Sequence, residues 1–126
     1  MDKLTRARDT ATRALATLEQ ILTESPSTIV RDAAIQRFEY TFEAVWKLLK
    51  AYLLERQGVD AGAPKACFRE ALKAGILTPE QVEQALVMTD DRNLTSHTYI
   101  ESIAVLVHSR LPAHAALMRA VAEKTA

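Results

Sequence analysis

The sequence contains little of what breaks or cross-links a chain. It has one cysteine, Cys67, which cannot form an internal disulfide, and its three glycines and four prolines are too few for a turn-rich all-β fold. No apolar run approaches the length needed to cross a bilayer, and no segment resembles a signal peptide. With 126 residues, of which 48% are hydrophobic, the chain is expected to form a single domain over residues 1–126 in the cytoplasm.

The sequence also has no net charge, because sixteen basic side chains balance sixteen acidic ones. Proteins that bind nucleic acid without selectivity are usually strongly basic, so the balance argues against tight, indiscriminate RNA binding by a lone subunit. Basic residues cluster in two places: Lys65, Arg69 and Lys73, and the tail residues Arg110, Arg119 and Lys124. The first cluster would either guide RNA or be an ordinary solvated helix face, and the solvated face is the simpler interpretation.

Apolar residues recur at helical spacing along most of the chain, and no segment alternates as a strand does. A first helix is expected from about Leu4 to Leu22, before a break at 25–28. The second helix is apolar on two sides, so we expect it to be central, or central on one side and paired with another subunit on the other. The first side holds Ile35, Phe38, Phe42, Val45, Trp46, Leu49 and Leu53, and the second holds Tyr40, Ala44, Leu48 and Tyr52.

Local signals mark several helix ends. Gly58 and Gly75 are each followed by an apolar β-branched residue, which predicts helix ends where glycine supplies the left-handed residue. Pro64 suits the first turn of a short third helix. The segment Thr78–Gln81 combines a cap, a first-turn proline and a capping-box glutamine, which predicts the start of the next helix.

The last helix has a start signal and an internal breaker. Thr98 and Glu101 match a second capping box, which predicts a helix from Tyr99. Pro112 should kink or divide that helix near His108, because proline lacks the backbone N–H. The sequence therefore predicts an all-α, up-and-down bundle of four to five helices.

The segment Asp91–Tyr99 gathers a guanidinium, an amide, hydroxyls, an imidazole and a phenol between apolar helical stretches. Arg92 can fork onto a phosphate, and His97 can exchange a proton near neutral pH. On an ideal helix these two positions would point roughly 140° apart, so one unbroken helix could not aim both at one atom. A bend just before Thr98 would let them converge. The segment predicts phosphodiester chemistry or nucleotide recognition.

The segment Arg92–Tyr99 resembles the R-x4-H-x-Y pattern of HEPN-domain proteins. Within that group the chain is similar to the nucleotidyltransferase substrate-binding family. In that family Arg37–Glu43, which reads RFEYTFE, and the following Trp46 and Lys47 have close counterparts. The resemblance covers about residues 31–111. It implies a helical bundle that pairs into a homodimer, with a minimal nucleotidyltransferase as operon partner.

Many such pairs are toxin and antitoxin, in which the HEPN chain is a metal-independent ribonuclease. By this resemblance His97 would be the general acid or base, Arg92 would stabilise the pentavalent phosphate, and Asn93 would position one of them. Tyr99 would receive AMP from the partner, and Glu43 and Ser96 would support the site. No metal or other cofactor is expected, since the sequence offers no clustered His/Cys/Asp ligand set.

Simpler roles exist for these residues. Arg92 would pair with Asp91 or Glu101 on the surface, His97 would be a loop histidine, and Tyr99 would anchor the bundle. Glu39 and Glu43 would either orient the motif or pair with Lys47 and Lys50, and for Glu39 we favour a lysine partner. His108 and His114 are expected to be structural, and Cys67 a small buried residue.

Three functions are therefore weighed. The first is a ribonuclease toxin that works as a homodimer and is neutralised by a nucleotidyltransferase. The second is a non-catalytic subunit that helps a nucleotidyltransferase bind its substrate. The third and weakest is a dimerisation module that uses the face of Tyr40, Ala44, Leu48 and Tyr52.

Overall fold

A computed structural model describes residues 2–97 and 99–126, apart from the side chain of His97. These residues form five helices and no strand. The helices are α1 (Lys3–Ile21), α2 (Thr28–Gln57), α3 (Pro64–Lys73), α4 (Pro79–His97) and α5 (Glu101–Lys124). The predicted all-α bundle is confirmed. Within the described ranges, no helix is long and apolar enough to cross a membrane.

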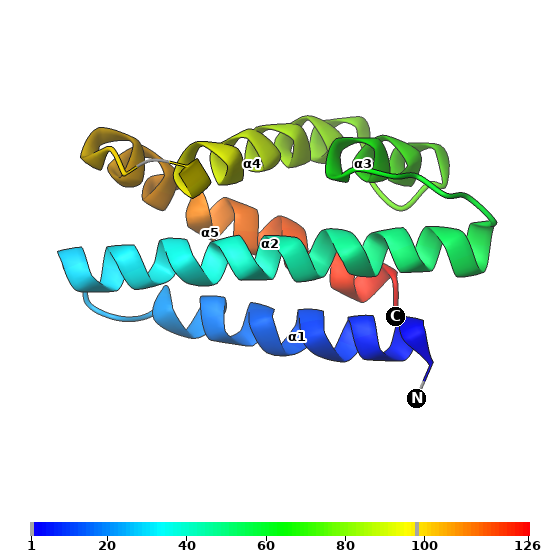
Figure 1. Ribbon diagram of the computed structural model, residues 1–126, viewed down its shortest axis with the longest axis horizontal. Coiled ribbons are helices and arrows are strands. Elements are labelled where there is room, and N and C mark those ends of the chain that lie inside the picture. Colours follow the sequence, from blue (N-terminus) through cyan, green and yellow to red (C-terminus); the bar gives the residue numbers. More distant parts are fainter. Residues whose placement is uncertain (1, 98) are drawn as a thin grey trace.

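The four long helices alternate in direction along the bundle (Figure 1). The central helix is α2, which packs against each of the other four. Both ends of the described chain lie at one end of the bundle, where the Arg8 guanidinium donates to the Thr125 carbonyl. The start of α5 lies at the opposite end, beside the first turns of α2 (Figure 1).

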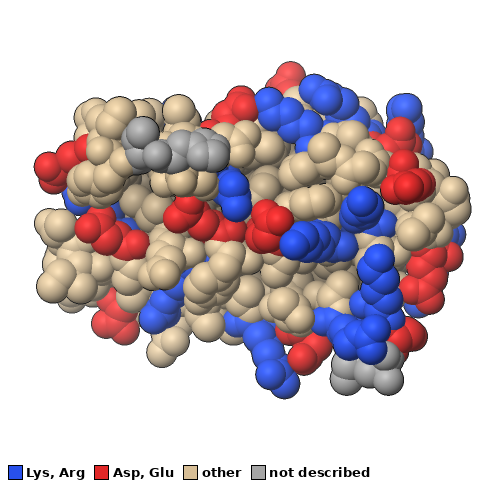
Figure 2. Space-filling view, in the orientation of Figure 1, with Lys and Arg blue, Asp and Glu red and all other residues tan. Residues whose placement is uncertain are grey.

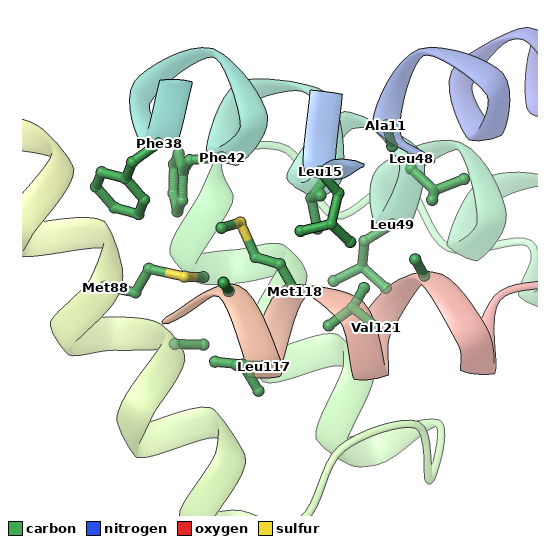
Figure 3. Packing of buried hydrophobic residues seen from close by; sticks show 14 of the residues in the cluster. Ala11, Leu15, Phe38, Phe42, Leu48, Leu49, Met88, Leu117, Met118 and Val121 are labelled. Atoms are coloured by element: carbon green, nitrogen blue, oxygen red, sulfur yellow. The ribbon is translucent and has the colours of Figure 1, made fainter. Parts of the chain in front are cut away.

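The core is built around α2 by apolar side chains from all five helices. Phe38 and Phe42 point towards Met88 of α4 and Met118 of α5 (Figure 3). Leu48 lies in the same core and is fully buried. The expectation that α2 is central is therefore confirmed, and Leu48 of its second apolar side is covered within the chain. Among its other members, Tyr40 is 44% exposed.

The local signals for helix ends are confirmed. Gly58 has φ of 68°, and the Val59 N–H donates to the Leu53 carbonyl at 3.1 Å, which closes α2 with a left-handed residue. Pro64 is the first residue of α3. At the start of α4 the Thr78 N–H donates to the Gln81 side chain at 2.9 Å, and the Gln81 N–H donates back to Thr78 Oγ1 at 3.2 Å.

Two expectations for the α4–α5 region are wrong, and a third is wrong in one of its two alternatives. The helix α4 runs through to His97 instead of bending before it. The helix α5 begins at Glu101 rather than at Tyr99, and Thr98 itself lies outside the described residues. Pro112 does not divide α5, because that helix is continuous to Lys124. Loss of one backbone N–H is tolerated there, since Leu111, His114 and Ala115 pack into the core on the other side of the helix.

Candidate functional site

The C-terminal half of α4 lies along α2, and this brings Arg92 to Glu43. Arg92 Nη2 is 3.6 Å from Glu43 Oε2, and the Arg92 side chain is 29% exposed. The same carboxylate accepts a hydrogen bond from Trp46 Nε1 at 3.1 Å and lies 3.3 Å from Lys47 Nζ. Glu43 therefore joins the motif arginine to the next turn of α2.

The surroundings of Glu43 keep it ionised. Burial alone would raise the pKa of Glu43, but hydrogen bonds from Trp46 and Lys47 and the charges of Lys47 and Arg92 lower it more. The net effect is a pKa below the ordinary value for a glutamate. The Arg92 guanidinium thus lies beside a carboxylate whose charged form is favoured, while its buried Nε has no acceptor in the described part of the chain. The Arg92 guanidinium has more N–H donors than the Glu43 carboxylate can accept.

Glu39 contacts the motif from the previous turn of α2. Its Oε2 accepts from Ser96 Oγ at 2.8 Å and lies 3.3 Å from Thr95 Oγ1. Both hydroxyls can instead donate to the Arg92 carbonyl, one turn earlier in α4. The expectation that Glu39 pairs with a lysine is wrong. Its contacts tie the end of α4 to α2.

Tyr99 stands in front of the first turn of α2. Its phenol oxygen accepts from Arg31 Nη2 at 2.7 Å, while its side chain is largely open to solvent, at 66% exposure. Arg31 also lies 3.2 Å from Asp32 and 3.4 Å from Glu101. Sequence reasoning missed Arg31. The available signal was its position on the apolar stripe of α2, four residues before Ile35, where a buried cation needs a partner.

Asp91, next to Arg92, points into the core. Its Oδ1 accepts from Arg110 Nη1 at 2.8 Å, and its Oδ2 lies 2.7 Å from His114 Nε2. The expected pairing of Arg92 with Asp91 or Glu101 is therefore wrong, because Asp91 pairs with Arg110 of α5 and Glu101 pairs with Arg31. His114 is structural, as expected, and its ring stacks on Phe38 at 5.6 Å. The sequence signal for a buried Asp91 was its position three residues after Met88, which places both on the same side of α4.

Two hollows adjoin these contacts. A shallow one beside Arg92 is lined by Glu39, Glu43 and Ser96, together with Gln36 and Tyr40. A second one, of about 240 Å³, lies beside Tyr99. Gln36 and Glu39 border both, so the two form one surface from Arg92 to Tyr99.

The family model described as "Nucleotidyltransferase substrate binding protein like" matches residues 7–126. The chain belongs to this family. A segment of 82 residues is 32% identical to a Haemophilus influenzae protein described as "Probable ribonuclease HepT", over 62% of this chain and 55% of the relative. The chain thus spans about half the length of that relative.

Three solved structures have a similar fold. A crystal structure of a protein from Thermus thermophilus is 50% identical and superposes with a TM-score of 0.87, over 91% of this chain and 98% of that one. A mutant of the toxin–antitoxin MntA-HpeT superposes with a TM-score of 0.77 over 96% of this chain and 95% of the other, at 14% identity. A toxin–antitoxin with AMP-PNP gives 0.76 over 98% and 97%, at 13% identity. At these low identities the likeness concerns the fold, and the predicted HEPN-like fold is confirmed.

In this member of the nucleotidyltransferase substrate-binding family the structure brings together only part of the predicted site. Arg92, Glu43 and Ser96 lie on one surface that extends to Tyr99. Asn93 is exposed and has no side-chain partner within residues 2–97 and 99–126. The His97 side chain lies outside the described part. Because α4 is helical through His97, positions 92 and 97 lie roughly 140° apart around its axis. No metal-binding cluster of His, Cys, Asp or Glu occurs among the described residues.

Proposed function

We propose that this chain is the ribonuclease toxin of a toxin–antitoxin pair, working on RNA without a metal. The ion pair between Arg92 and Glu43 carries the proposal, because it fixes a guanidinium beside an open hollow on α2. A fixed guanidinium stabilises the crowded phosphate of an attacked phosphodiester. The name of the Haemophilus influenzae relative supports the same reaction class.

The proposed reaction is an attack by the ribose 2′-oxygen on the neighbouring phosphorus. His97 takes the 2′-hydroxyl proton or gives a proton to the departing 5′-oxygen, and Arg92 holds the phosphate oxygens. The new bond joins the 2′-oxygen to phosphorus, and the bond to the 5′-oxygen breaks. The products are a 2′,3′-cyclic phosphate and a free 5′-hydroxyl. Asn93, on the exposed side of α4, is proposed to position one of the two groups.

We propose that the working unit is a homodimer in which Arg92 of one subunit and His97 of the other meet at one phosphate. The helical course of α4 supports this arrangement, since one helix directs positions 92 and 97 apart. A two-fold dimer would then contain two such mixed sites.

Tyr99 is the proposed acceptor of AMP from a minimal nucleotidyltransferase. Its exposure of 66% leaves the phenol accessible to an enzyme. The Arg31 guanidinium at 2.7 Å would stay beside the phosphate of the adenylyl group once that group is attached. The phenol oxygen would bond to the α-phosphorus of ATP, and pyrophosphate would leave. The added bulk and negative charge would then block the surface between Tyr99 and Arg92.

Replacing His97 by Ala should abolish RNA cleavage and growth arrest while leaving helical content unchanged. The matched control is His108→Ala, a histidine of α5 outside the motif, which should keep both activities. Mixing Arg92→Ala chains with His97→Ala chains should restore about a quarter of the activity, because random pairing rebuilds one intact site in half of the dimers. A His97→Ala variant as toxic as the parent would show that the catalytic assignment is wrong.

A non-catalytic substrate-binding subunit is the second candidate, and the description of the family model favours it. In that case the purified chain would not cut RNA, and a nucleotidyltransferase partner would lose substrate affinity in its absence. Intact-mass measurement after co-expression separates the two candidates. An AMP increment that disappears in Tyr99→Phe supports the toxin, whereas an unmodified chain in a stable complex supports the substrate-binding subunit.

A further inference from the structure

A groove between α1 and α2 collects positive charge that the sequence does not reveal. It has a volume of about 450 Å³, and its lining includes four cations and no carboxylate. The cations are Lys3 and Arg6 of α1 and Lys47 and Lys50 of α2. Figure 2 shows Lys and Arg side chains gathered over the N-terminal end of α1 and the adjoining part of α2, at the lower right.

Four cations of the two basic groups noted in the sequence are paired with carboxylates instead. Lys65 lies 2.7 Å from Asp90, and Lys73 lies 3.2 Å from Glu70. In the tail, Arg110 pairs with Asp91, and Arg119 pairs with Glu19. Among the three lysines of the groove, Lys47 lies 3.3 Å from Glu43 and already has its counter-charge. Arg6 lies near the charge of Asp2, so Lys3 and Lys50 are the main source of positive potential in the groove.

The floor of the groove is suited to a ligand with flat apolar parts. Its other lining residues are three alanines, Thr10 and Trp46, which is the only tryptophan in the chain. Trp46 is partly buried, and its indole N–H is already used by Glu43, so its ring is fixed in place. A fixed aromatic ring beside several cations is the combination with which proteins bind single-stranded nucleic acid.

The groove also continues the candidate site. Glu43 contacts Arg92 on one side and Trp46 and Lys47 on the other, so one carboxylate separates the motif arginine from the first cation of the groove. From Glu43 to Ala51 the helix rises roughly 12 Å, which equals three to four nucleotides of a stacked strand.

We propose that this groove holds the single strand of RNA on one side of the phosphate at Arg92, with a base against Trp46 and phosphates at Lys3 and Lys50. The proposal rests on the proposed function in placing a phosphate at Arg92. The strand runs along α2 and crosses to α1. The selectivity for a single strand comes from the ring, because a duplex hides its base faces.

The test uses the full chain and a hexauridylate with 2′-O-methyl groups, which cannot be cut. Binding should quench the fluorescence of Trp46, which is the only tryptophan. The double variant Lys3→Ala, Lys50→Ala should bind roughly 20-fold more weakly at about 0.1 M salt, and its log–log salt slope should be shallower by about 1.4. The control Arg69→Ala, Lys124→Ala removes two exposed cations outside the groove and should match the parent.

Several results would overturn the proposal: no binding of the oligonucleotide, binding without a change in Trp46 fluorescence, or equal affinity and salt slope in the double variant. A double variant that binds RNA normally but loses a nucleotidyltransferase partner would assign the groove to protein docking. Comparing binding with cleavage of unmodified RNA separates this proposal from the proposed nuclease activity. If the parent quenches on binding but never cuts unmodified RNA, the groove stands and the nuclease assignment fails. If the Lys3→Ala, Lys50→Ala variant binds RNA with unchanged affinity and still cuts it, the nuclease assignment stands and the groove proposal fails.

Discussion

Asp91 and His114 lie 2.7 Å apart, from carboxylate Oδ2 to imidazole Nε2, in the interior between α4 and α5. Both side chains are almost completely enclosed, with exposures of 1% and 3%. Arg110 donates to the second carboxylate oxygen, and the His114 ring stacks on Phe38. Because Arg92 is the next residue, this contact fixes the rotation of α4 at the start of the candidate site.

Removing the carboxylate of Asp91 should destabilise the fold. Asp91→Ala leaves a buried imidazole nitrogen and an arginine without their acceptor, so we expect the free energy of unfolding in urea to fall by about 3 kcal/mol. The matched control is the neighbouring Asp90→Ala, whose ion pair with Lys65 is on the surface and should cost less than about 1 kcal/mol. Equal losses of unfolding free energy in the two variants would show that the buried contact of Asp91 contributes no more stability than the surface ion pair of Asp90.

Glu43 should contribute to stability in a pH-dependent way. Its pKa in the folded chain lies below the ordinary value of 4.5. The unfolded chain therefore takes up the proton first as the pH falls, and the contribution of the charged form is lost only on passing below the folded pKa. The stability difference between the parent and Glu43→Gln should thus be full above pH 4.5 and vanish in stronger acid. Urea titrations from neutral to acidic pH measure it, and a constant difference would contradict the ion pair with Arg92.

Cys67 should be unreactive while the protein is folded. The side chain is fully buried, and burial raises the pKa of the thiol, with the charge of Asp60 adding to the effect and that of Lys50 opposing it. Iodoacetamide at neutral pH should therefore modify the native chain far more slowly than the chain in concentrated urea. Mass spectrometry at timed intervals follows the reaction, and equal rates would mean that the contact region of α2 and α3 opens readily.

Gly58 should be the residue that ends α2 cleanly. With φ of 68° it occupies a region where a Cβ is strained, even though no atom within 4 Å would clash with one. Gly58→Ala should lower the free energy of unfolding by about 1 kcal/mol, and Gly58→Asn by less, because asparagine tolerates this region better. Thermal unfolding of the two variants gives the order. Identical midpoints for parent and alanine variant would remove the conformational argument.

The parts of this structure that depend on neighbouring residues could be predicted from the sequence. The stop at Gly58 and the capping box of Thr78 and Gln81 act within a few residues, so their geometry follows from local chemistry. The core side of α2 around Phe38 and Phe42 also followed, since periodicity records which face is buried.

The parts that depend on contacts between distant residues could not be predicted. Arg31 and Tyr99 are 68 positions apart, and Ser96 and Glu39 are 57 apart, so no local pattern signals either hydrogen bond. The extension of α4 to His97 has the same origin, because tertiary contacts outweigh the modest helix propensity of Thr95 and Ser96. The groove cations come from two helices, and their meeting is visible only in the fold.

The common position of the two chain ends governs how this protein can be labelled. A fluorophore or affinity handle fused at either end would stand away from Tyr99 by nearly the length of α2, roughly 45 Å, and would leave the surface around Tyr99 unobstructed. The same fusion would lie beside Lys3 and Arg6, where an acidic peptide would compete with an anionic ligand for the cations of the proposed groove. Proteolytic trimming of such extensions before the titration proposed above would remove this competition.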